Sequence, residues 1–113
     1  MGAKPRKFRP TSVTLRNREW PIHYVQPEHE QLASGDPDAH NLGCCNCHTR
    51  QIYIDKTQSD DSLQNTLYHE IAHAYVLGSG EYTDYDLEER SVCQMTEWLI
   101  ELEAAGLVVL KIK

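Results

Sequence analysis

Apolar and polar residues alternate along "TSVTLRNREWPIHYV", residues 11–25, on both sides of the polar tetrapeptide "RNRE". Such alternation is typical of strands with one buried face, and a short polar break between two of them predicts a β-hairpin. We therefore expect strands near 11–16 and 19–25. A third run rich in strand-forming residues, "RQIYID" at 50–55, predicts another short strand.

A helical period begins after residue 58. Apolar residues recur there at spacings of three and four, at Leu63, Leu67, Ile71 and Ala74. Ser59, Asp60 or Asp61 can cap the start of this helix, and we expect Gly78 and Gly80 to stop it.

A second helix is expected to start after Thr83 or Asp84, to run through "LEERSVCQMTEWLIELEAA" and to end at Gly106. Its buried face is marked by residues at helical spacing: Val92, Met95, Thr96, Leu99 and Leu102. The final segment, "LVVLKIK", is an apolar tail that we expect either to pack on the body or to pair at a sheet edge.

The segment 26–43, "QPEHEQLASGDPDAHNLG", is rich in Pro, Gly, Asp and Ser, and predicts a long loop that can border a cleft. The elements together predict an α+β fold, in which a small antiparallel sheet of about three strands carries two main helices against one face. We expect one domain over residues 11–113, preceded by a basic, flexible arm at 1–10. Trp20 and Trp98 are expected to pack in or near the core, and His23, His29 and His40 to lie on the surface.

The length and composition of the chain are consistent with a single small domain. With 113 residues, 40% of them hydrophobic and 25% charged, the chain has room for one modest core, and it has no apolar run near the ~18 residues of a membrane span. No apolar stretch follows the basic start "MGAKPRKFRP", so a secretory signal is not expected. We therefore expect a cytoplasmic protein with reduced cysteines.

Charge is unevenly distributed. Residues 1–18 hold six of the eleven basic residues and no acidic one, whereas the rest of the chain holds all 17 acidic residues. A basic arm of this kind can contact nucleic acid, but no aromatic stacking residues accompany it and the body is acidic. We therefore expect a solvated arm and no nucleic-acid binding.

The segment "NTLYHEIAHAYV" places two histidines four residues apart in the first helix. At about 100° per residue, His69 and His73 lie one turn apart on one face and can reach the same ion. Zn²⁺ suits imidazole ligands, and hydrolytic zinc sites use three protein ligands and leave a position for water. Glu70 lies on the neighbouring arc and can take a proton from a water acidified by the metal. The motif predicts a zinc centre with Glu70 as general base, the alternative being a helix that carries two histidines by chance.

The second helix offers two candidates for the third ligand. Glu89 leads into its buried face, and Glu88 lies on the opposite flank. Periodicity alone does not separate them, and at least one is a solvated acid of the kind favoured in the first turn of a helix.

The residues "IYIDKTQSDDSLQNTLYHEIAHAYV" followed by "EERSVCQMTEWL" resemble the ImmA/IrrE-type metallopeptidase family, including its short phage-encoded members. The resemblance covers about residues 11–103 in outline. It implies a minimal, zincin-like fold of the gluzincin type, in which the second helix supplies a glutamate ligand. The family pattern places Met95 and Thr96 six and seven residues after that glutamate, which implies that Glu89 is the third ligand. Cys93 stands where the family commonly has Asn or Asp.

The resemblance also implies an activity: zinc-dependent hydrolysis of a peptide bond in a protein or peptide substrate, often a repressor that controls a mobile element. The alternative is a non-catalytic, zinc-stabilised module that binds a phage or host protein. The sequence predicts neither the substrate nor the oligomeric state.

A peptidase needs a hydrogen-bond donor for the oxyanion. The candidates near the motif are Tyr68, Tyr75, Tyr82 and Tyr85, and the sequence does not choose among them.

The segment "GCCNCHTR" offers Cys44, Cys47 and His48 at the ligand spacing of a second, structural zinc site. Covalent haem attachment does not fit a reducing compartment, and a redox Cys-x-x-Cys does not fit a segment that runs into a strand. In the family a Gly-containing segment precedes the Ile-x-Ile-Asp strand. The resemblance therefore implies that these cysteines, Cys45 among them, line the substrate groove.

Overall fold

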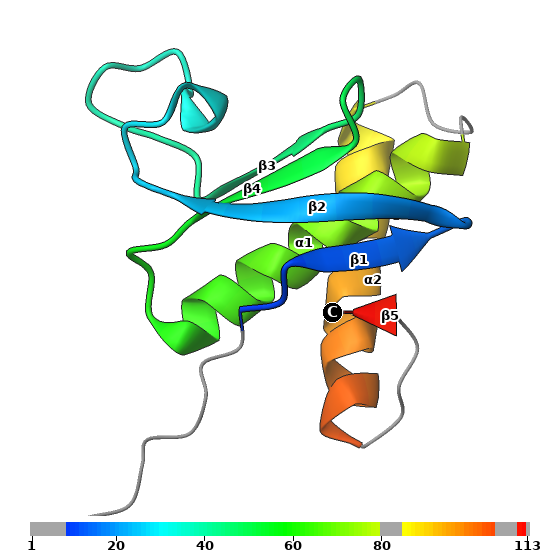
Figure 1. Ribbon diagram of the computed structural model, residues 1–113. Coiled ribbons are helices and arrows are strands. Elements are labelled where there is room, and N and C mark those ends of the chain that lie inside the picture. Colours follow the sequence, from blue (N-terminus) through cyan, green and yellow to red (C-terminus); the bar gives the residue numbers. More distant parts are fainter. Residues whose placement is uncertain (1–8, 80–84, 106–110, 113) are drawn as a thin grey trace, which may run out of the picture.

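The structure is a computed structural model that describes residues 9–79, 85–105 and 111–112, the side chains of 77–79, 85–88 and 111–112 excepted. Its elements in chain order are β1 (Ser12–Leu15), β2 (Arg18–Val25), the 3₁₀ helix η1 (Glu30–Leu32), β3 (Gly43–Asn46), β4 (Gln51–Asp55), α1 (Asp60–Ser79), α2 (Tyr85–Ala104) and β5 (Lys111–Ile112). Figure 1 shows one sheet with both helices behind it, so the predicted α+β class is confirmed.

The sheet is mixed and has five strands in the order β3-β4-β2-β1-β5. The prediction of about three antiparallel strands is wrong in two respects. Gly43–Asn46 forms an edge strand antiparallel to β4, and β2 pairs with β4 in parallel, with Ile22 opposite Ile52. The parallel pair arises because the segment after β2 returns along the edge as β3 before the chain enters β4.

The predicted hairpin is confirmed, with β1 and β2 joined by a two-residue turn. Its central residues, Arg16 and Asn17, both have left-handed backbones, with φ of 51° and 64°. Positive φ at both central residues defines the type I′ turn, whose twist matches that of the two strands.

Both predicted helices are present, but the predicted end of the first helix, α1, is wrong. The Ser59 carbonyl accepts from the Leu63 N–H, and its hydroxyl oxygen accepts from the Ser62 N–H at 3.3 Å, so Ser59 caps α1. The helix runs through Gly78 to Ser79, so Gly78 does not stop it. Gly80, Thr83, Asp84 and Gly106 lie outside the described residues.

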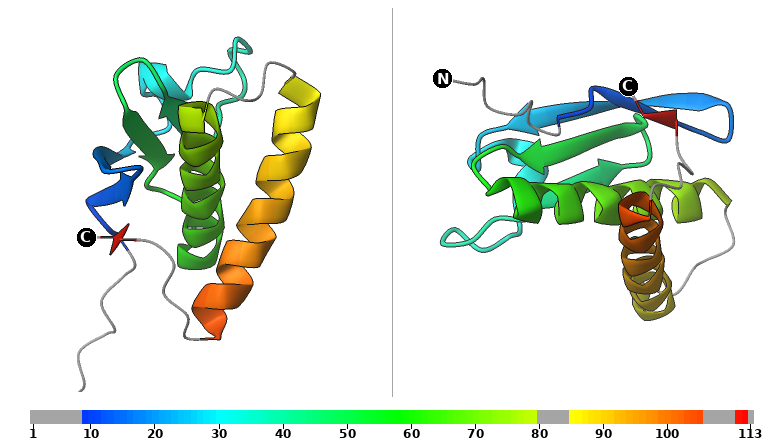
Figure 2. Two further views of the ribbon diagram at one scale, coloured as in Figure 1. Left: turned by 90° about the vertical axis from the view of Figure 1, so that its right-hand side faces the viewer. Right: turned by 90° about the horizontal axis from the view of Figure 1, so that it is seen from below.

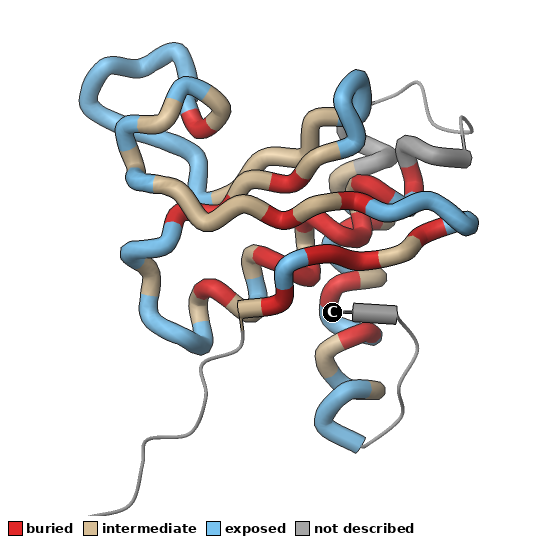
Figure 3. The backbone as a smooth tube through the Cα atoms, in the orientation of Figure 1, coloured by how far each residue is buried: buried red, intermediate tan, exposed pale blue. Residues whose placement is uncertain are grey.

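The helices form two successive layers on the same side of the sheet (Figure 2). Helix α1 packs on the sheet and α2 packs on α1. The predicted apolar positions of α1, together with Val92, Thr96 and Leu99 of α2, are buried. Figure 3 shows that buried residues concentrate where the sheet faces α1.

The two tryptophans have different environments. Trp20 is buried on β2, as predicted, but the Trp98 side chain is 57% exposed, so its predicted packing is wrong. Val92, Thr96 and Leu99 form the buried side of α2, and Trp98 lies outside it.

The described residues nearest to the two ends of the chain, residues 9–10 and 111–112, lie at the sheet. Residues 111–112 of the apolar tail pair with β1 at the sheet edge, as expected. Residues 1–8 of the predicted basic arm lie outside the described residues, whereas Arg9 lies over the Tyr24 ring and Pro10 accepts a hydrogen bond from the Tyr24 hydroxyl. No described helix is long and apolar enough to cross a bilayer.

Candidate metal centre

The two histidines of the His-Glu-x-x-His motif lie on one face of α1, one turn apart. The centroids of the His69 and His73 rings are 4.9 Å apart in an edge-on arrangement. The helix is anchored by its opposite face, where Leu67, Ile71 and Ala74 are buried in the core. This anchoring directs both imidazoles away from the core, toward the start of α2.

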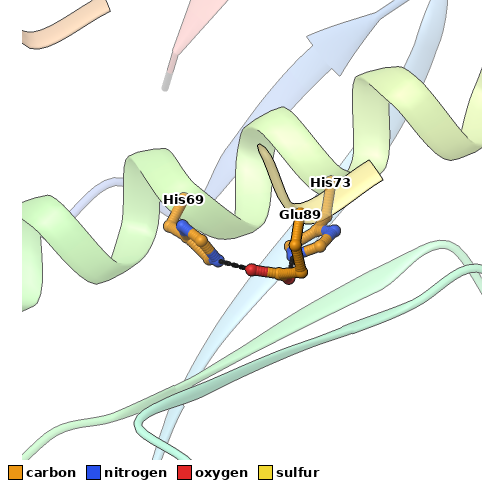
Figure 4. Close-up of side chains that lie close together, drawn as sticks. All are labelled: His69, His73 and Glu89. Atoms are coloured by element: carbon orange, nitrogen blue, oxygen red, sulfur yellow. Dashed lines mark ion pairs between the residues drawn. The ribbon is translucent and has the colours of Figure 1, made fainter. Parts of the chain in front are cut away.

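Glu89 of α2 completes the group. Its Oε1 lies 2.6 Å from His73 Nε2 and its Oε2 lies 3.7 Å from His69 Nε2, so one carboxylate spans both rings (Figure 4). The position of Glu89 is set by the next turn of α2, where Val92 is fully buried against α1. The side chain of Glu88 lies outside the described residues.

The spacing of these three side chains fits a zinc ion. One ligand atom from each of His69, His73 and Glu89 lies within 4.8 Å of the others. Nitrogen and oxygen ligands at about 2.0–2.2 Å from a tetrahedral Zn²⁺ stand roughly 3.3–3.6 Å apart, so small side-chain rotations are enough to hold the ion. Among the described residues, this is the one His/Cys/Asp/Glu group that meets the spacing.

The environment favours the ligand form of His69. Burial, and then the neighbouring His73, lower the pKa of His69 below its usual value, although Glu89 acts in the opposite direction. A lowered pKa keeps the imidazole neutral near pH 7, and the neutral ring is the form that binds a metal.

Glu70 is a buried carboxyl beside this group. Its side chain is only 7% exposed. Burial, the largest cause, raises the pKa of Glu70 to about 7, while His73 lowers it and Glu89 raises it. A carboxyl with a pKa near neutral can both accept and return a proton, which is the property of a general base.

A glycine allows the edge strand to cover Glu70. A Cβ added at Gly43 would lie 2.8 Å from Glu70 Cγ and 2.8 Å from Thr66 Cγ2. These distances are shorter than a carbon–carbon contact, so a larger residue would displace either β3 or the carboxyl. The absence of a side chain at Gly43 is therefore one cause of the burial of Glu70.

The group of His69, His73 and Glu89 and the neighbouring Glu70 open into one cleft of about 730 Å³ between β3, the two helices and the end of the 26–42 loop. Its walls are His40, Asn41, Leu42, Gly43, Cys44, Cys45, Asn65, Thr66, His69, Glu70, His73 and Glu89. The prediction that the loop borders a cleft is confirmed. The volume is sufficient for several residues of a peptide rather than a single small ion.

His40 is exposed, as predicted, and it also lines this cleft. Its Nε2 lies 2.7 Å from Oδ2 of Asp55, whose side chain is 3% exposed. Burial by itself raises the pKa of Asp55, but hydrogen bonds from Thr57 and His40 outweigh burial and hold this pKa below its usual range. The ionised carboxylate accepts from His40 Nε2–H. Nδ1 has no hydrogen-bond partner among the described residues and is left for a ligand.

The cysteine motif does not form a second metal site within the described residues. Cys44 and Cys45 line the cleft, as the resemblance implies, but Cys47 and His48 lie in the exposed β3–β4 turn. Burial, and then the charge of Glu70, raise the pKa of the Cys44 thiol. Cys44 is therefore held as a neutral thiol beside the cleft.

Two of the four tyrosines considered as oxyanion donors, Tyr68 and Tyr75, do not line the cleft. Tyr68 is buried in the core and Tyr75 stacks on Arg16. Tyr82 and the side chain of Tyr85 lie outside the described residues.

Comparisons with protein-family models, with curated proteins and with solved structures found no match to this chain, so the assignment of a function rests on the motifs and on the geometry above.

Proposed function

We propose that this protein is a zinc-dependent peptidase of the ImmA/IrrE type, with His69, His73 and Glu89 as metal ligands and Glu70 as general base. One observation carries the proposal. Ligand atoms from two separate helices converge within 4.8 Å, in the same cleft as a carboxyl that is only 7% exposed. A structural zinc site would have four protein ligands and no open cleft, whereas a catalytic site has three and keeps one position accessible.

When bound, Zn²⁺ supplies Lewis-acid polarisation of the scissile carbonyl and acidifies a water. The protein residues do the rest. Glu70 takes the proton from the attacking water, holds it on its carboxyl, and passes it to the amine of the leaving peptide. Its covered position under Gly43 keeps bulk water from competing for that proton.

The edge strand favours an extended peptide as substrate. Among the described residues, β3 is an edge strand that pairs with β4 alone, and its residues Gly43, Cys44 and Cys45 line the cleft that contains Glu70. A peptide in extended conformation can add to such an edge through backbone hydrogen bonds, which present its carbonyl groups to the site in register.

His40 supplies the missing oxyanion donor in this proposal. Asp55 holds the ring through Nε2, so Nδ1 is the ring atom of His40 that can contact a substrate carbonyl in the cleft. A donor of this kind stabilises the charge that develops on the carbonyl oxygen.

The assay that tests the activity is digestion of a proteome-derived peptide library, read by mass spectrometry. We expect the zinc-loaded protein to generate new peptide termini, which 1,10-phenanthroline abolishes and added Zn²⁺ restores. Cleavage that persists at full metal removal would contradict the proposal. So would a fully zinc-occupied protein that leaves every peptide in the library intact.

Replacing His40 with alanine is expected to lower kcat by about 10²-fold at unchanged zinc content, because it removes one oxyanion donor. The matched control is His48→Ala, which removes an exposed histidine from the β3–β4 turn. Steady-state kinetics on a peptide identified in the library screen separates the effects. A raised KM at constant kcat would instead make His40 a substrate-binding residue.

A further inference from the structure

A second hollow lies between the β1–β2 turn, the β3–β4 turn and the later part of α1. It has a volume of about 280 Å³, and three arginines from the two turns and β2 line it: Arg16, Arg18 and Arg50. Leu15, Trp20 and Ala74, all buried, form its apolar floor. We propose that this arginine pocket binds a compact dianionic oxyanion, namely a phosphate group. The proposal does not depend on the peptidase function.

Contacts within the protein hold two parts of the pocket in place. The Arg16 guanidinium carbon lies 4.3 Å from the centroid of the Tyr75 ring, which holds this side chain over α1. The β3–β4 turn is closed by Asn46, whose Oδ1 accepts from the backbone N–H groups of His48 and Thr49 at 3.1 and 3.2 Å. Arg50 follows directly, so its backbone position is set by a bonded turn. A site whose donors are positioned in advance loses less entropy on binding.

Two of the arginines have an unfavourable backbone conformation. The φ angle is 51° at Arg16 and 55° at Arg50, in the left-handed region that glycine and asparagine occupy with less strain. The fold by itself therefore favours asparagine or glycine at both positions. That both carry arginine, and that both side chains line one pocket, indicates a use for the guanidinium groups beyond folding.

The described residues provide no counter-charge. None of their carboxylates forms an ion pair with Arg16, Arg18 or Arg50, whereas Arg9 pairs with Asp60 at 3.9 Å. Three positive charges around one small hollow repel each other, and a bound anion relieves that repulsion.

Size and charge select the ligand. A phosphate group carries about −1.5 to −2 and offers several oxygens to the planar donor pairs of arginine. The hollow is smaller than the roughly 300–1,000 Å³ of typical small-molecule sites, so it suits a group rather than a large ligand. A long polyanion such as nucleic acid is disfavoured, because the whole chain has a formal net charge of −6.

The test compares inorganic phosphate with sodium chloride at matched ionic strength, by calorimetry and by thermal melting. We expect phosphate to bind and to raise the Tm of the wild-type protein. Arg16→Asn and Arg50→Gly should each weaken binding by about tenfold or more, because each removes a charge-assisted donor. In phosphate-free buffer the same variants should melt at the same or a higher temperature, because each relieves a left-handed arginine. Arg90→Ala, an exposed arginine on α2, is the control and should bind as the wild type does.

A chemical probe localises the ligand. Cys47 lines the pocket and Cys93 lies exposed on α2. Phosphate should slow alkylation of Cys47 by iodoacetamide and leave the alkylation of Cys93 unchanged, as measured by peptide mass spectrometry.

The source of the phosphate is resolved in the same assays. Tighter binding of a phosphoserine peptide than of inorganic phosphate assigns the pocket to phosphorylated proteins, and equal binding assigns it to free phosphate. Affinity that grows with the length of a single-stranded oligonucleotide lacking a 5′-phosphate would overturn the proposal. Equal loss of phosphate binding in Arg90→Ala would do the same. The proposal would also be overturned if phosphate bound only to the double variant Glu81→Gln/Asp84→Asn. That result would mean that carboxylates of the chain itself occupy the pocket in the wild-type protein.

Discussion

Replacing Glu70 with glutamine is expected to reduce kcat by about 10²–10⁴-fold, the usual contribution of a general base. Glutamine has the size of glutamate and fits beneath Gly43, but it does not take up a proton. The zinc content of the variant, measured by elemental mass spectrometry, should equal that of the wild type, because Glu70 is not part of the converging ligand group. Loss of turnover with retained metal distinguishes a peptidase from a zinc-stabilised binding module.

The thermal stability of the Glu70→Gln variant should not fall with its activity, and we expect its Tm to be equal to or higher than that of the wild type. Glu70 is 7% exposed, and an ionised carboxylate at such a position carries a desolvation cost that a neutral amide lacks. Without metal, the Glu70→Gln variant should therefore melt at the same or a higher temperature than the wild type. Glu101→Gln, on the exposed side of α2, controls for the loss of one negative charge and should leave both kcat and Tm unchanged. Full peptidase activity in Glu70→Gln would remove Glu70 from the mechanism.

The part of the site that the sequence predicts is the part that a single helix contains. His69, Glu70 and His73 lie within five consecutive residues, and helical geometry alone puts them on one side of α1. Glu89 required a different argument, since periodicity leaves Glu88 and Glu89 equivalent and only the family resemblance selects one. The structure brings Glu89 to the histidines because Val92, one turn later, is buried against α1.

The parts that escaped prediction depend on contacts between distant segments. His40 and Asp55 are 15 residues apart, and no periodicity links a loop residue to the last residue of a strand. The parallel pairing of β2 with β4 has the same origin, because it follows from the path of the 26–50 segment. Strand β3 is short and contains Gly43 and Asn46, so its composition does not predict a strand. Gly43 was the available signal, since a glycine facing a helix often marks a close approach of two backbones.

The second large effect is expected from Glu89→Gln, which should weaken zinc binding about 100-fold or more. Loss of a supporting hydrogen bond to a metal ligand costs about 10–100-fold in affinity, so loss of a ligand itself should cost about 100-fold or more. At a free zinc concentration of 100 times the wild-type Kd, zinc adds about 2.7 kcal/mol to the free energy of unfolding of the wild type. The same concentration adds only about 0.4 kcal/mol to a variant that binds 100-fold more weakly. In a domain of this size the difference corresponds to roughly 10 °C in Tm.

The matched control is Glu88→Gln, which removes the same charge from the neighbouring position of the same helix. We expect it to bind zinc and to melt as the wild type does. Without metal, all three proteins should agree within about 1 kcal/mol, because Glu89 is 30% exposed and its contact with His73 is partly screened by water. The difference between the proteins should therefore appear only when zinc is added, in calorimetric titration and in melting curves alike. If zinc binding were lost in Glu88→Gln and kept in Glu89→Gln, the third ligand would be Glu88 and not Glu89. Zinc binding retained in both variants would mean that the two histidines hold the ion without a carboxylate from α2, and the proposed catalytic centre would not exist.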